Sequence, residues 1–98
     1  MIWMKVYPTQ GEILLAACDE ETLGKSFYEG ELQLIVSKSF YGGEKVSQEL
    51  FREQLKEATI VNLVGKEVVG IAQELGLLNT GGIIEIDGVP HAQIAKLI

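Results

Sequence analysis

The sequence predicts an α+β fold, with a mostly antiparallel or mixed sheet formed by N- and C-terminal hairpins and with helices packed on one face. Three observations lead to this prediction. Apolar runs of strand length occur in pairs at both ends of the chain, and a turn signal separates each pair. The middle of the chain has the apolar periodicity of helices. Because 98 residues hold one core, we expect residues 1–98 to form a single domain.

The N-terminal hairpin is predicted from two apolar runs. Residues 2–7 are rich in β-branched and aromatic side chains, which favour strands. A Pro-Thr-Gln-Gly turn follows, and a second strand is expected over residues 12–18. A single helical turn is then expected over residues 19–24, with Asp19 as its N-cap residue.

The next segments are predicted to be a strand, a loop and a helix. Residues 31–37 begin with alternating leucine and polar side chains, which predicts a third strand. Residues 39–43 are expected to form a glycine-bearing loop. Ser47 is expected to be the N-cap of a helix through about Ala58, because the apolar residues there share one face.

Residues 59–75 have two interpretations. Their apolar residues match the stripe of a helix, and we predict helix with a break near Thr59 or Gly65. Residues 60–64 also have the composition of a buried strand. Gly76 is expected to end the helical segment as its C-cap.

The C-terminal hairpin is predicted from Asp87 and Gly88, because a type I′ turn needs a positive φ at both central positions. Residues 82–86 form the strand before this turn, and the partner strand begins at Val89. Pro90 has no N–H to donate. We therefore expect the second strand to lie at a sheet edge, or its ladder to be interrupted at Pro90.

Composition argues against several classes of function. The chain carries 14 acidic and 8 scattered basic residues, a net charge of −6, so non-specific nucleic-acid binding is not expected. A basic surface on a partner protein is compatible with this charge. One cysteine allows neither an internal disulfide nor a CxxC metal site, and we predict no metal and no cofactor. No segment has the apolar length of a signal peptide or a bilayer span, so we expect a cytoplasmic protein without membrane contact.

Four motifs resemble a known protein family. They are CDEETLGKSF, FYGGE, ATIVNLVGKE and DGVPHAQ, which follow one another over almost the whole chain. These motifs are similar to those of the DUF424 family, small archaeal proteins of unknown function. The resemblance implies a compact α+β protein of the archaeal cytoplasm, with no established activity and an association with translation. The residues it draws attention to are Cys18, Asp19, Gly24, Lys25, Tyr41, Gly42, Gly43, Asn62, Gly65, Pro90 and His91.

Cys18 and His91 are the residues that a small enzyme would use. Cys18 precedes a predicted helix start, which lowers the pKa of a thiol, but the acidic residues beside it raise that pKa. His91 could act as a general base, alone or paired with Cys18 and oriented by Asn62. We favour the structural alternatives, which are a buried apolar thiol and a hydrogen-bonded histidine.

The segment from Phe40 to Gly43 is the strongest candidate for recognition. Aromatic rings supply contact area, and paired glycines let a backbone approach a ligand. The alternative is that these rings fold inward and cover the core. The predicted binding residues, expected to meet on one side of the molecule, are Phe40, Tyr41, Gly42, Gly43, Asn62, Pro90 and His91.

The leading hypothesis is a non-catalytic accessory module that docks on a protein or ribonucleoprotein partner. It is based on the absence of paired catalytic groups, on the loop aromatics and on the family resemblance. A small enzyme that uses Cys18 or His91, and a small-molecule-binding domain, are the alternatives. An exposed apolar patch would favour docking, whereas polar groups gathered in one cleft would favour an enzyme.

Overall fold

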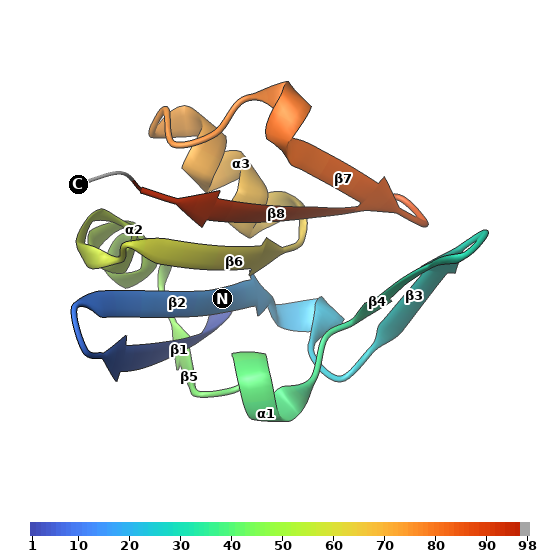
Figure 1. Ribbon diagram of the computed structural model, residues 1–98. Helices are drawn as coiled ribbons and strands as arrows, with labels where there is room; N and C mark the ends of the chain where they lie inside the picture. The colour runs from blue at the N-terminus through green and yellow to red at the C-terminus, as the bar shows by residue number, and fades with distance from the viewer. Residues whose placement is uncertain (97–98) are drawn as a thin grey trace.

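The computed structural model describes residues 1–96, which fold into a sheet with two longer helices on one side and a small hairpin with a short helix on the other (Figure 1). Within these residues, six strands are ordered β5-β1-β2-β6-β8-β7, and β3 and β4 form a separate two-stranded sheet. The predicted α+β class is therefore confirmed. The strands are β1 (Ile2–Thr9), β2 (Glu12–Asp19), β3 (Ser26–Glu29), β4 (Leu32–Ile35), β5 (Glu44–Val46), β6 (Ile60–Val64), β7 (Ile83–Ile86) and β8 (Val89–Ala95). The helical segments are η1 (Glu20–Thr22), α1 (Lys38–Tyr41), α2 (Gln48–Glu57), α3 (Lys66–Glu74) and η2 (Thr80–Gly82).

Both predicted hairpins belong to the same sheet. Strands β1 and β2 pair antiparallel, as do β7 and β8. Strand β6 lies between the hairpins and pairs parallel with β2 and antiparallel with β8. The sheet is therefore mixed, and β6 joins its two halves.

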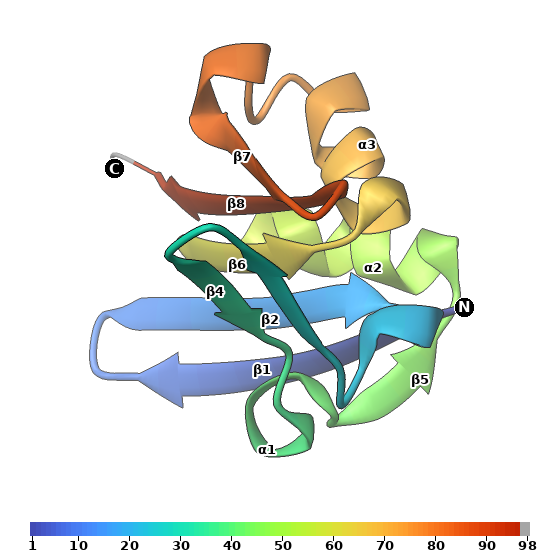
Figure 2. The same cartoon turned by 90° about the vertical axis from the view of Figure 1, so that its right-hand side faces the viewer.

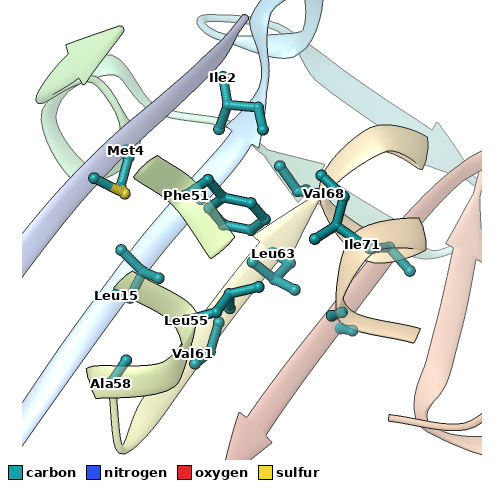
Figure 3. Packing of buried hydrophobic residues seen from close by; sticks show 14 of the residues in the cluster. Ile2, Met4, Leu15, Phe51, Leu55, Ala58, Val61, Leu63, Val68 and Ile71 are labelled. Carbon is teal, nitrogen blue, oxygen red and sulfur yellow. The ribbon is translucent and has the colours of Figure 1, made fainter. Parts of the chain in front are cut away.

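The larger core lies between the sheet and helices α2 and α3, as Figure 3 shows. Alternate strand residues point to this side, and the apolar stripes of both helices meet them. Burying one Val, Leu, Ile or Phe side chain contributes about 1.5–3 kcal/mol, so this layer supplies much of the driving force for folding. Its large members include Ile2, Leu15, Phe51, Leu55, Val61, Leu63 and Val68.

The β3–β4 hairpin and α1 lie against the opposite face of the sheet (Figure 2). Phe27 and Leu34, which face each other in the hairpin, pack towards Cys18 and Val64 of the sheet. Tyr41 of α1 is buried in the same cluster. This second layer is smaller than the helical layer and leaves part of the face uncovered.

The prediction of helix over residues 59–64 is wrong, because residues 60–64 form β6. A central strand is apolar on both sides: Val61 and Leu63 face the helices, whereas Val64 faces the hairpin. This continuous run matches a helical stripe over a short window. The break is at Gly65, whose φ of 120° and ψ of 156° precede the first residue of α3.

Pro90 lies in β8, an interior strand, so the prediction of an edge strand is wrong. The alternative is an interrupted ladder, but on the β7 side the pairing runs through Pro90, which is opposite Glu85. Paired residues of β6 and β8 end at Val64 and His91, just before Pro90. The Pro90 carbonyl still accepts a hydrogen bond from the Gly65 N–H at 2.9 Å.

Three short segments were mispredicted or missed. Residues 39–41 belong to helix α1 instead of a loop, because the Ser37 side chain caps α1 by accepting from the Phe40 N–H at 3.2 Å. Strand β3 was missed because its sequence, SFYE, has no clear alternation. Strand β5 has only three residues, too few for a periodic signal.

Candidate functional site

One part of the hairpin-side face of the sheet is uncovered, and we call it the open face. It extends over β2, β6, β8 and β7, and shallow hollows run along it. Its side chains are those of Leu14, Ile60, Asn62, Ile84, His91, Gln93 and Ala95. Ile60 is 38% exposed and Ile84 56% exposed. These two isoleucines lie on strands separated by β8, so the open face offers aliphatic contact at two separate points.

Asn62 is held in one orientation by Tyr41. The Tyr41 hydroxyl donates to the Asn62 side-chain oxygen Oδ1 at 2.5 Å. Tyr41 is buried, and this burial, followed by the nearby Cys18, raises the pKa of its hydroxyl to about 12. The hydroxyl is therefore a donor at neutral pH, and the Asn62 amide nitrogen Nδ2 has no hydrogen-bond partner among residues 1–96.

His91 is held in the same way by the backbone of β6. Its ring nitrogen Nδ1 lies 2.9 Å from the Leu63 carbonyl oxygen. A carbonyl only accepts hydrogen bonds, so Nδ1 carries a proton and the ring is fixed in orientation, with Nε2 as its second polar atom. His91 is half-buried beside Ile84, its cross-strand neighbour.

The open face thus combines fixed polar groups with exposed aliphatic ones. Asn62 is opposite Gln93, two residues along β8 from His91, and such diagonal neighbours are about 7–8 Å apart. Two oriented polar side chains, Asn62 and His91, therefore share the centre of the open face. Such an arrangement can bind a partner through apolar contacts, while hydrogen bonds to the polar side chains fix the position of that partner on the face.

The structure distributes the predicted binding residues between surface and core. Asn62 and His91 lie on the open face, and Tyr41 of α1, on the same side of the sheet, holds Asn62 through its hydroxyl. Phe40 is half-buried, with its ring 5.4 Å from the Tyr7 ring. Pro90 is buried in β8.

Gly42 and Gly43 follow α1 and are required by close backbone approach, Gly43 to β1 and Gly42 to the last turn of α1 itself. A Cβ atom on Gly43 would lie 2.5 Å from the Met4 carbonyl oxygen, which is closer than Cβ atoms approach other atoms in proteins. A Cβ atom on Gly42 would lie 2.6 Å from the Lys38 carbonyl oxygen. Both glycines are explained by close backbone approach within the protein.

Cys18 and His91 do not meet. Cys18 is opposite Val64, and Val64 is opposite His91, so one strand separates them and their backbones are about 10 Å apart. Cys18 has no exposed surface. Burial, with help from the Asp19 and Glu21 carboxylates and against a hydrogen bond from Thr22, raises the pKa of its thiol to about 11. This geometry opposes a nucleophilic role for Cys18.

The sequence suggested that the Asp19 side chain caps η1. In the structure this side chain makes no such cap and caps α3 instead. Its carboxylate accepts from the Glu67 N–H at 2.9 Å and from the Val68 N–H at 3.0 Å. Burial raises the pKa of this carboxyl, whereas the two backbone N–H groups oppose the shift. Lys25 and Lys66 line a cleft beside it, but the carboxylate already occupies the anion-binding end of α3.

Within residues 1–96, no three His, Cys, Asp or Glu side chains gather closely enough to hold a metal ion. No helix of this part of the chain has the length and apolar character needed to cross a membrane.

The exposed members of the open face were missed in the sequence. Ile60, Ile84 and Gln93 have no motif around them, and which strand face each occupies depends on the register. One signal was present. The run from Gly82 to Ile86 has isoleucines at adjacent positions, which point to opposite faces of a strand.

Comparisons with known proteins agree with the motifs. The chain matches the family described as "Protein of unknown function (DUF424)" over residues 7–97. It is also similar to a crystal structure of an uncharacterized conserved protein from Methanopyrus kandleri, with a TM-score of 0.76 and 26% sequence identity. This similarity covers 99% of the present chain and 94% of that protein. A comparison with curated proteins found no match.

Proposed function

The chain belongs to the DUF424 family, which has no known function, and we propose that it is a non-catalytic docking module whose open face binds a partner protein. The observation that carries this proposal is the pair of hydrogen bonds that fix Asn62 and His91 between exposed aliphatic side chains. The rival enzymatic reading loses its support because Cys18 is buried, protonated and separated from His91.

The width of the open face favours a helix as the bound segment. The face extends over four strands, which span about 14 Å at the usual strand spacing. An α-helix with its side chains is about 10–12 Å wide. Helices α2 and α3 cover the other face of the same sheet in this way. A partner helix on the open face would complete a second helical layer.

The charge of the chain indicates which kind of helix fits. Glu12 lies on the same strand face as Leu14, and Glu29 and Glu31 lie at the tip of the neighbouring hairpin. Lys5 of the same sheet face donates from its Nζ to the Ser39 carbonyl at 3.0 Å, and Glu12 and Glu29 likewise accept one hydrogen bond each, from the Thr59 hydroxyl and the Asp87 N–H. The acidic side chains around the open face outnumber Lys5. An amphipathic helix with an apolar stripe, one polar side chain within it and Lys or Arg at its margins matches these groups. A ribonucleoprotein, including one that acts in translation, would be contacted through its protein component.

Capture of partners from a native extract, with matched variants as bait, tests the proposal. Ile60→Asp and Leu50→Asp form a matched pair, because these side chains are 38% and 39% exposed but lie on the open face and on α2, respectively. Thermal unfolding first establishes that both variants are folded. We expect Ile60→Asp and His91→Ala to lose the same protein that the wild type and Leu50→Asp retain.

Two results would contradict the proposal. One is equal capture by the wild type and by both open-face variants. The other is capture that ribonuclease abolishes and open-face variants do not affect, since the contact would then be with RNA elsewhere on the surface.

A further inference from the structure

Strand β7 is an edge of the six-stranded sheet and pairs only with β8. The two-residue turn makes Ile86 and Val89 a hydrogen-bonded pair, so Glu85 and Pro90 form the next, non-hydrogen-bonded pair. The main-chain N–H and C=O of Glu85 therefore point away from the sheet. Neither group has a hydrogen-bond partner within residues 1–96. The Ile83 N–H, in contrast, is bonded to the Thr80 carbonyl.

A groove lies beside this edge, between β7 and α3. Lys66, Val69, Gly70 and Gln73 line it from the helix, and Ile83 and Glu85 line it from the strand. A Cβ atom built on Gly70 would meet no other atom within 4 Å, so the helix leaves open space there. Side chains of a further strand would have room to lie over the groove.

We propose that β7 binds an extended segment of a partner protein, which adds to the sheet as an antiparallel strand with a Lys or Arg opposite Glu85. Antiparallel addition lets one partner residue exchange two main-chain hydrogen bonds with Glu85. That residue points to the same face as the Glu85 side chain, whose carboxylate makes no ion pair among the described residues. Its two neighbours point to the other face, where the exposed Ile84 favours apolar side chains.

A second copy of the chain does not fit this edge. Self-pairing centred on Glu85 would place two Glu85 carboxylates directly opposite each other, and like charges in that position destabilise a sheet. A short, charged edge strand of this kind protects a protein from self-association. The Glu85 carboxylate attracts a strand that carries Lys or Arg, so this edge favours a basic partner strand over a second copy of the chain.

Two synthetic peptides test the proposal against the intact protein. Their sequences are acetyl-Thr-Val-Lys-Val-Thr-amide and acetyl-Thr-Val-Glu-Val-Thr-amide, and amide chemical shifts are followed by NMR up to millimolar peptide. The expected result is a shift of resonances in β7 and on the groove side of α3, with the lysine peptide binding about threefold or more tightly. Glu85→Lys should reverse the preference. Glu53→Lys, the same charge change on the exposed surface of α2, should leave it intact.

Several results would overturn the proposal. They are an absence of shifts with both peptides, shifts confined to the open face or to the β3–β4 hairpin, and a preference that Glu85→Lys does not change. A wild-type dimer with β7 at its interface would also overturn it. The open face is not altered by Glu85→Lys, so the result is independent of the proposed function.

Discussion

Gly65→Ala is expected to be among the most destabilising single-methyl changes that this protein offers. Gly65 adopts a φ of 120° and a ψ of 156°, a backbone region that is essentially restricted to glycine. Its Cβ atom would also lie within 2.5 Å of both carboxylate oxygens of Asp19. Asp19 cannot move aside freely, because both oxygens accept hydrogen bonds from the first turn of α3.

The magnitude follows from these two effects. Backbone strain of this kind costs about 1–3 kcal/mol. Displacing the carboxylate weakens two hydrogen bonds to a charged group, each worth about 1.5–3 kcal/mol when lost outright. We therefore expect Gly65→Ala to reduce the free energy of unfolding by about 3–5 kcal/mol. Domains of this size have about 5–15 kcal/mol in total, so much of the stability would be lost.

Urea unfolding, followed by circular dichroism, measures this change against Gly70→Ala. Gly70 lies within α3, the helix that Gly65 precedes, and a Cβ atom there has no close neighbour. Gly70→Ala should therefore raise the free energy of unfolding by about 0.5–1 kcal/mol. In an Asp19→Ala background the clash is absent, so the second substitution should cost less than it does alone. A Gly65→Ala cost below about 1 kcal/mol, or equal costs in both backgrounds, would refute the reasoning.

Three further predictions follow from buried or capping groups. Because the folded state keeps the Cys18 thiol protonated up to a pKa of about 11, stability should fall by about 2 kcal/mol between pH 9 and 11. Cys18→Ala should flatten this fall in pH-dependent urea titrations, and an unchanged slope would contradict it. Tyr41→Phe leaves Asn62 Oδ1 unpaired and should lower the free energy of unfolding by about 1–2 kcal/mol, against about 3–5 kcal/mol for Tyr41→Ala; unchanged stability in Tyr41→Phe would show that the hydrogen bond contributes nothing. Ser47→Ala should lower stability by about 1 kcal/mol in thermal unfolding, because the Ser47 side chain accepts from the Leu50 N–H, and no loss would exclude it as a cap.

The sequence predicted those features that local backbone chemistry determines. The Ser47 cap begins α2 as expected. Asp87 and Gly88 have φ values of 53° and 77°, as a type I′ turn requires. Gly76, with a φ of 74°, follows the end of α3. Each signal depends on one to four neighbouring residues, so it can be recognised without knowledge of the rest of the fold.

Features that depend on distant partners were not predictable in the same way. Residues 60–64 became a strand because β2 and β8 flank them on both sides, and their own pattern fits helix as well. Asp19 has the sequence position of a local cap but bonds to residues 48 and 49 positions away. The hydrogen bond between Tyr41 and Asn62 joins two motifs, and neither motif contains a signal of the other.

Most of the motif residues that resemble the family are explained by packing within the fold, but one of them, Asn62, is not. Asp19 and Gly65 fit each other so closely that each restricts the other, and Gly43 is needed for the approach of α1 to β1. Asn62 differs from these residues. A buried tyrosine hydroxyl needs only an acceptor, which the hydroxyl of a threonine, a good strand former, would also provide. An asparagine at this position additionally directs an N–H donor out of the sheet, where no packing requirement within the described residues accounts for it. On the docking role that we propose, this donor would serve a group that the open face binds.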